Sequence, residues 1–131
     1  MKLIDVFILG ILLGSFLFFY INKKFKKIRN KKILKKAKKA EIKAVDFLRK
    51  KGYKILAIQK KKPIVIYINN KSYESFVKAD LIVKKGTKKY IVEVKTGQQT
   101  KATLPHVRRQ LLEYYLVYLP HGILLLDMER K

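Results

Sequence analysis

The 131-residue chain contains no cysteine and no tryptophan, and it has only three prolines and nine acidic residues. The absence of cysteine excludes disulfides, thiolate metal sites and thiol nucleophiles. Against the nine acids stand 32 lysines and arginines, which give a formal net charge of +23. This excess attracts polyanions, either nucleic acid or anionic lipid. A general bias toward lysine is an alternative source of part of it, because only five basic residues are arginine.

The N-terminus carries a long apolar run. Residues 3–21 read LIDVFILGILLGSFLFFYI, with Asp5 as the only charge. A helix of this length spans about 28 Å, close to the hydrocarbon thickness of a bilayer. A cleaved signal peptide would carry its positive charge before the run and a small-residue cleavage site after it. Because lysines follow the run here, we expect residues 1–22 to form a transmembrane anchor.

A polybasic stretch follows the anchor. Residues 23–39 hold eleven lysines and arginines and no acid. Positive flanks stay on the cytoplasmic side, and they bind anionic headgroups. We therefore expect a polybasic juxtamembrane helix over residues 23–37 and a cytoplasmic domain over residues 38–131, in a single-pass protein of the cell membrane. Gly10 and Gly14 form one GxxxG spacing, which leaves a homodimer open.

The rest of the sequence predicts a helix, several strands, a second helix and a last strand. A helix over about residues 31–51 is indicated by an apolar stripe that Gly52 ends; its members are Leu34, Ala37, Ala44, Val45 and Leu48, with Glu41 along it. Strands are predicted over residues 54–59, 64–68, 76–83, 90–95 and 123–127. This order describes an α/β domain in which a small mixed sheet is flanked by helices.

Punctuating residues set the boundaries of these elements. Pro63 is expected to break the chain between the first two strands, and Asn69–Asn70 is a turn signal. A second helix is expected to run to about Tyr118, with Thr103 as its N-cap and Pro105 in its first turn.

The segment around Gly86 fixes a strand register. If Gly86 and Thr87 form a two-residue type II′ turn, every cross-strand pair sums to 173 in residue number. Asp80 then lies opposite Glu93, with the β-carbons roughly 5 Å apart. Strand alternation places Lys95 on the same face as Glu93.

Two facing carboxylates repel each other within otherwise apolar strands. A divalent cation would compensate this repulsion, because carboxylate oxygens suit Mg²⁺ or Mn²⁺. With Lys95 beside them, Asp80 and Glu93 predict a site for water attack on a phosphodiester. A same-face salt bridge between Glu93 and Lys95 is the simpler alternative.

The second predicted helix carries a polar residue on its apolar face. Val107, Leu111, Tyr114 and Tyr118 share this face with Gln110. A buried amide needs hydrogen-bond partners. A nearby site would supply them; a strand end is the alternative partner.

These motifs resemble the PD-(D/E)XK, or restriction-endonuclease-like, nucleases, and among them the RecB-type and Holliday-junction-resolvase-like branches. The resemblance covers about residues 38–127 and rests on four segments: AEIKAVDFLRKKGYKIL, ADLIV, YIVEVKTG and RRQLLEYYLVY. It implies an αβββαβ core. Ala79 replaces the proline of the family name, residues 64–73 look like an inserted hairpin, and the anchor lies outside the family's core.

The resemblance also implies roles for individual residues. Asp80, Glu93, the Val94 carbonyl and Glu41 would bind the metal. Lys95 would orient the attacking water and contact the phosphate. Gln110 and Tyr114 match the Q-x-x-x-Y element of RecB-type nucleases.

The expected function is therefore a membrane-anchored, Mg²⁺- or Mn²⁺-dependent nuclease acting on DNA, with RNA left open. Lys101, Arg108 and Arg109 are candidates for phosphate contacts. A membrane-tethered, non-catalytic nucleic-acid-binding protein and a lipid-binding adaptor are the alternatives. His106 and His121 have no metal-ligand spacing, and Asp127 and Glu129 are expected at the surface.

Overall fold

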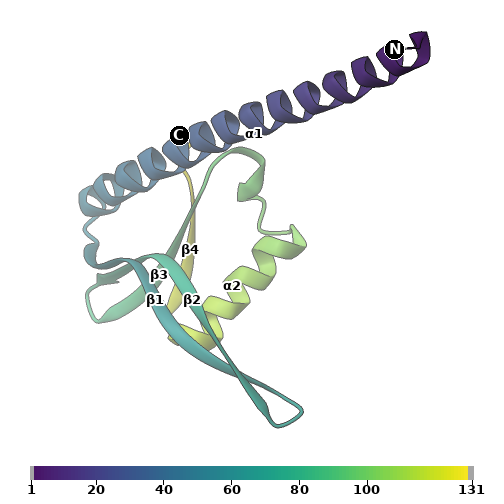
Figure 1. The fold of residues 1–131 in the computed structure, drawn as a ribbon. Helices are drawn as coiled ribbons and strands as arrows, with labels where there is room; N and C mark the ends of the chain where they lie inside the picture. The colour runs from purple at the N-terminus through teal and green to yellow at the C-terminus, as the bar shows by residue number, and fades with distance from the viewer. Residues whose placement is uncertain (1, 130–131) are drawn as a thin grey trace. The chain divides into compact units, whose positions relative to one another are not determined.

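The computed structural model describes residues 2–129, with residues 98 and 99 described without their side chains. The outer bounds of the predicted segments, residues 1 and 131, lie outside this range. The chain divides into two compact units, Met1–Lys36 and Ala37–Lys131. Its elements in chain order are α1 (Leu3–Lys50), β1 (Lys54–Ile68), β2 (Lys71–Lys85), β3 (Lys88–Lys95), the 3₁₀ turn η1 (Gly97–Thr100), α2 (Pro105–Tyr118) and β4 (Gly122–Asp127) (Figure 1).

Helix α1 is a single helix of 48 residues. The helix predicted from about residue 31 therefore begins much earlier, at Leu3. The physical reason is composition, because no proline or glycine occurs between residues 15 and 51 and lysine is a good helix former. Within residues 2–129, α1 is the one helix long and apolar enough to cross a membrane.

Only the C-terminal part of α1 contributes to the core of the second unit. Ala40, Ala44, Val45 and Leu48 are its buried residues. The predicted stripe was wrong at its beginning, because Leu34 is 69% exposed and Ala37 is exposed as well.

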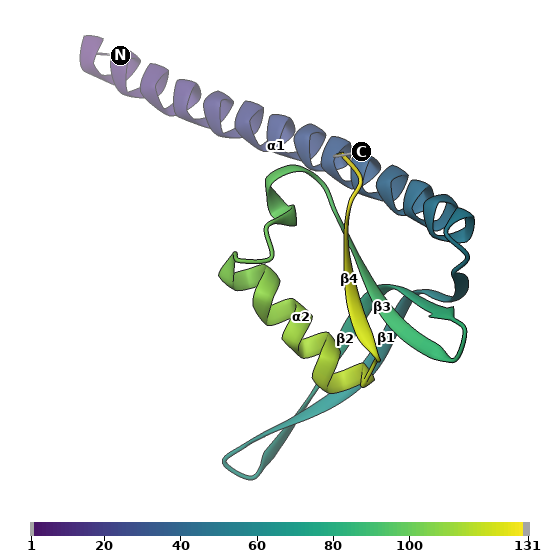
Figure 2. The ribbon, with the colours of Figure 1, turned by 180° about the vertical axis from the view of Figure 1, so that it is seen from behind.

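The second unit contains a four-stranded mixed sheet in the order β1-β2-β3-β4. The first two pairings are antiparallel, and β4 pairs parallel to β3. A parallel pair needs a crossover connection, and α2 provides it. Figure 2 shows β3 and β4 side by side, with α2 next to them. The expected α/β class with a small mixed sheet is confirmed.

Strands β1 and β2 form one long hairpin. The predicted break at Pro63 was wrong: β1 runs through this residue, which pairs with Phe76. Proline lacks an N–H to donate, and β1 tolerates it because β1 is an edge strand of the sheet. The predicted turn is confirmed, since Asn69 and Asn70 both have positive φ, as a type I′ turn requires.

The sheet packs on both faces. On one face Ala44, Val45 and Leu48 of α1 pack against the sheet, where their buried partners are Leu81, Val83 and Val92. On the other, Tyr114 and Tyr118 of α2 pack with four sheet residues, Val77, Ala79, Ile82 and Ile91. The predicted N-cap of α2 was wrong. Leu104 occupies that position without a side-chain cap, and Pro105 starts the helix, where no N–H is needed.

We predict that Leu48→Ala lowers the free energy of unfolding by about 2–5 kcal/mol, because it removes a buried side chain and leaves a cavity. Leu48 is 1% exposed in the first of these clusters. Denaturant unfolding of the full-length protein in mild detergent, followed by near-ultraviolet circular dichroism of the buried tyrosines, measures this loss. Ile42→Ala is the matched control, because Ile42 lies on the same helix and is 59% exposed. Equal losses in the two variants would contradict the assignment of this core.

Candidate active site

The candidate site lies where β2 and β3 part. Their ladder begins at Lys85–Lys88 and ends at Leu81–Val92. The predicted register is confirmed over these pairs, whereas the expected Asp80–Glu93 pair is not part of the ladder. Gly86 has a φ of 60° and Thr87 is not among the residues with positive φ, as a type II′ turn requires. Beyond this ladder, β2 continues with β1, whereas β3 continues with β4. Asp80 and Glu93 are the first residues past the last pair.

The hairpin is irregular at this position. The ladder of β1 and β2 passes from Ile58–Leu81 to Lys60–Ala79 without a pair between Gln59 and Asp80. Gln59 has a φ of 53°, a conformation that is rare for a residue other than glycine. The buried side chains also change face here. Ala79 packs with the α2 cluster, whereas Leu81, two residues later, packs with the α1 cluster.

The Asp80 carboxylate accepts a backbone hydrogen bond from β3 beyond the point where the β2–β3 ladder ends. Its Oδ2 accepts a hydrogen bond of 3.0 Å from the backbone N–H of Val94, a residue beyond the ladder with β2. Burial of Asp80, followed by the negative charge of Glu93, raises its pKa to about 6. The charge of Glu41 and a hydrogen bond to Glu93 act in the same direction, and the Val94 N–H opposes them. Burial and the neighbouring Glu93 therefore disfavour the ionised form of Asp80.

Glu93 is buried, with 3% exposure, and both of its carboxylate oxygens have partners. Oε1 lies 2.7 Å from Lys95 Nζ and accepts a 2.9 Å hydrogen bond from Gln110 Nε2. Oε2 accepts a 2.6 Å hydrogen bond from the Tyr114 hydroxyl. The predicted inward direction of Gln110 is thus confirmed, and its partners are Glu93 and Tyr114.

Two tyrosines of α2 connect the site to β1 and β2. Tyr114 Oη lies 3.0 Å from the Lys78 carbonyl oxygen, in addition to its bond to Glu93. Burial, and then Glu93, raise the pKa of Tyr114, so this hydroxyl stays protonated and donates. Tyr118 Oη lies 2.6 Å from the Lys60 carbonyl oxygen and 2.7 Å from that of Val77. Burial raises the pKa of Tyr118 as well.

The acids of the site suit a cation that needs few protein ligands. Within residues 2–129, no group of three or more histidines and acids is placed to hold a metal ion. Glu41 acts on Asp80 through its charge, and its predicted role as a ligand stays a prediction. The carboxylates of Asp80 and Glu93 are the oxygen donors of the site. Mg²⁺ commonly uses one or two carboxylates and keeps several waters, so the pair fits such an ion.

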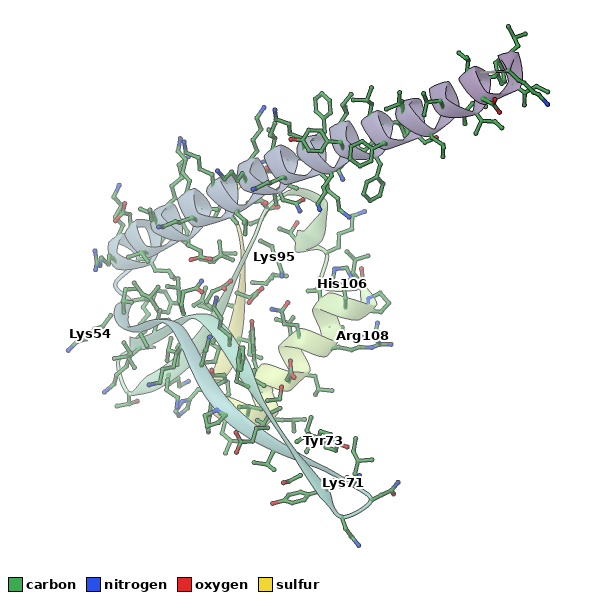
Figure 3. All side chains as sticks on the ribbon, in the orientation of Figure 1. Lys54, Lys71, Tyr73, Lys95, His106 and Arg108 are labelled. Atoms are coloured by element: carbon green, nitrogen blue, oxygen red, sulfur yellow. The ribbon has the colours of Figure 1, made fainter. Side chains whose placement is uncertain are left out.

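The remaining predicted residues divide between surface and interior. Lys101, Arg108 and Arg109 are exposed, as is His106, and Figure 3 shows His106 and Arg108 on the first turns of α2. His121 is structural, because its Nδ1 accepts the backbone N–H of Lys89 at 3.0 Å. Asp127 was wrongly placed at the surface. It is half-buried and pairs with Lys95 in the β3–β4 ladder.

Sequence reasoning treated Tyr118 only as an apolar helix residue. Its hydroxyl lies within hydrogen-bond distance of two backbone carbonyl oxygens, one in each strand, at the point where the hairpin leaves the sheet. The available signal was spacing, because Gln110, Tyr114 and Tyr118 follow one another at four-residue intervals and so share one helix face.

We predict that Asp80→Asn stabilises the metal-free protein at pH 8 but not at pH 4. The folded protein holds the Asp80 proton up to about pH 6, and the unfolded chain releases it near 3.8. Stability therefore falls as pH rises through this window, and asparagine removes the loss while still accepting the Val94 N–H. After a discount for partial exposure, the gain is on the order of 1–2 kcal/mol. Thermal unfolding in EDTA at both pH values measures it, and an equal effect at pH 4 would contradict the raised pKa.

No protein-family model matches the chain, and no curated protein matches it. Among solved structures, it is similar to the crystal structure of SSO0001, with a TM-score of 0.53 and 19% sequence identity. The similarity covers 72% of this chain and 46% of that one, so the chain spans less than half the length of its neighbour. At this level of identity, the likeness shows a shared fold alone.

Proposed function

We propose that this protein is a metal-dependent nuclease of the restriction-endonuclease-like type, held at a membrane by α1. The observation that carries the proposal is the convergence of Asp80, Glu93 and Lys95 where β2 and β3 part, with Glu93 held by Gln110 and Tyr114. A buried acid pair in which one pKa is raised by the other is costly for a structure to retain. Perturbed acids of this kind are typical of functional sites.

Each group has a part in phosphodiester hydrolysis. A divalent cation bound by Asp80 and Glu93 would supply a water of lowered pKa and neutralise charge on the phosphate. Gln110 and Tyr114 fix the orientation of the Glu93 carboxylate through hydrogen bonds of 2.9 and 2.6 Å. Lys95 neutralises Glu93 in the metal-free protein. In the proposed reaction its ammonium would contact a phosphate oxygen as negative charge develops there.

DNA is the proposed substrate. A formal charge of +23 favours a polyanion. Lys101 is exposed in the segment before α2, and Arg108 and Arg109 are exposed in the early turns of α2. The same chemistry applies to RNA, which the assay below includes as a substrate.

The proposed setting is the cytoplasmic face of the cell membrane, with a single crossing. The apolar part of α1 is long enough for the crossing, and the eleven basic residues within 23–39 follow it. Positive flanks stay on the cytoplasmic side, which orients the second unit toward the cytoplasm. The polybasic segment also favours anionic lipid at that face.

We predict that the full-length protein in neutral detergent cleaves linear, circular or single-stranded DNA, or RNA, when Mg²⁺ or Mn²⁺ is present. Because Asp80→Asn and Glu93→Gln remove the carboxylates, each is expected to lower the rate at least about 100-fold, as is addition of EDTA. Lys95→Ala is expected to do the same through loss of the phosphate contact. The rate of substrate loss on denaturing gels is the measurement.

Glu113→Gln is the matched control for this assay, because Glu113 is an exposed acid on the same helix as Gln110. Its rate should equal that of the wild type. Thermal unfolding with and without Mg²⁺ separates the alternatives. A folded wild-type protein that binds DNA but neither cuts it nor gains stability from the metal would support the non-catalytic binding module.

We predict that residues before and after the apolar segment of α1 label from opposite sides of the membrane. The chain has no cysteine, so single substitutions report position without background. In intact cells, a membrane-impermeant maleimide should label Lys2→Cys and leave Ser72→Cys unlabelled until the cells are opened. The reverse pattern would overturn the proposed orientation, and labelling of both in intact cells would overturn the crossing.

A further inference from the structure

The β1–β2 hairpin extends well beyond the rest of the sheet. Its two-stranded part, called the arm, runs from the Lys60–Ala79 pair to the Ile68–Lys71 pair (residues 60–79). Strand β3 does not accompany it, because the β2–β3 ladder ends at Leu81–Val92. At about 3.3 Å per residue, the arm is roughly 25–30 Å long. Figures 1 and 2 show it projecting past the end of α2.

The base of the arm is fixed to the helix that carries site residues. Tyr118 Oη lies within 2.7 Å of two backbone carbonyl oxygens, one in each strand of the arm. Lys62 Nζ donates a 2.6 Å hydrogen bond to the Val117 carbonyl oxygen. Because α2 also carries Gln110 and Tyr114, the direction of the arm is set relative to the candidate active site.

The outer part of the arm presents large side chains to solvent. Tyr67 is 75% exposed, Phe76 53% and Tyr73 49%. Figure 3 shows Tyr73 and Lys71 near the tip. A two-stranded hairpin is only marginally stable in water, and exposed apolar side chains on it indicate a surface that binds a partner.

The charge of the arm selects among partners. It carries five lysines, residues 60, 61, 62, 71 and 78, against the single acid Glu74. Two such arms would repel each other, which disfavours a second copy. Its tip is the polar sequence Asn69-Asn70-Lys71, which would have to enter a bilayer first, and this disfavours insertion into lipid.

A nucleic acid fits both the exposed aromatic side chains and the positive charge of the arm. Lysines neutralise phosphates, exposed tyrosine and phenylalanine rings contact bases and thymine methyl groups, and asparagine amides pair with adenine. One lysine already lies over an aromatic ring, with Lys61 Nζ 4.4 Å from the ring centroid of Phe76. The major groove of DNA admits a two-stranded β-ribbon.

We propose that the arm is a DNA-binding ribbon, which enters a groove of duplex DNA about one helical turn from Asp80 and Glu93. This inference rests on the proposed function only in taking the bound DNA as substrate. The arm would set where the duplex lies relative to the site, so that binding energy from a distant segment positions the phosphodiester.

The test is equilibrium binding of the full-length protein, in neutral detergent with EDTA, to a fluorescent 30-bp duplex. The double substitution Tyr67→Ala with Tyr73→Ala is expected to weaken binding about tenfold. Lys61→Ala with Lys71→Ala is expected to reduce the slope of log affinity against log salt by about 2. Tyr115→Ala and Lys54→Ala are matched controls, because both residues are exposed, lie outside the arm and have no role in the proposed site. Both controls should bind as the wild type does.

Unchanged binding by both arm variants, or no binding by the wild type, would overturn the proposal. Two further results for the arm variants would also overturn it. One is a change in the oligomeric mass of the protein with DNA affinity unchanged, and the other is weaker binding to vesicles of anionic lipid with DNA affinity unchanged. Because EDTA prevents cleavage, the result is independent of catalysis. If DNA binding depends on the arm but no Mg²⁺-dependent cleavage occurs, the proposed nuclease activity is refuted and the DNA-binding arm is supported. If cleavage occurs and the arm variants bind DNA as the wild type does, the nuclease activity is supported and the DNA-binding arm is refuted.

Discussion

The candidate site depends on one constraint: buried peptide groups must keep hydrogen-bond partners where β2 separates from β3. The Asp80 carboxylate accepts the Val94 N–H beyond the last ladder pair. Tyr114 and Tyr118 provide hydroxyls near carbonyl oxygens of β2 on the same side of the split. Asp80, Tyr114 and Tyr118 therefore lie together where the strands separate. The same polar side chains that form the site provide partners for backbone groups of the fold.

Charge is arranged differently in the site and in the rest of the chain. Lysines are spread along the whole chain, whereas acids interact with one another at the site. Glu93 is 3% exposed there, and its charge and that of Glu41 raise the pKa of Asp80. Lys95, Gln110 and Tyr114 compensate the negative charge of Glu93. Burial and the charge of Glu93 disfavour the ionised form of Asp80. In the proposed reaction, a small cation and a phosphate would bring further charges to this acid pair.

The separation of β2 from β3 also produces the long β1–β2 hairpin. Because β2 leaves β3 at Asp80, its remaining residues pair with β1 alone and extend beyond the sheet. Tyr118 and Lys62 then fix the base of this extension to α2. Catalytic and binding elements in the proposals above thus share one helix as their support.

The sequence by itself determined the apolar N-terminal helix, the α/β class and the pairing register, because hydrophobic periodicity and turn residues act locally. Gly86 set the register that brings Asp80 beside Glu93, and four-residue spacing placed Gln110 on the face of Tyr114. Tertiary structure alone decided that β1 continues through Pro63, since only its position at the sheet edge removes the need for an N–H. It also decided which residues of α1 are buried and that Tyr118 holds the hairpin, because burial and hydrogen bonding there depend on residues distant in the chain.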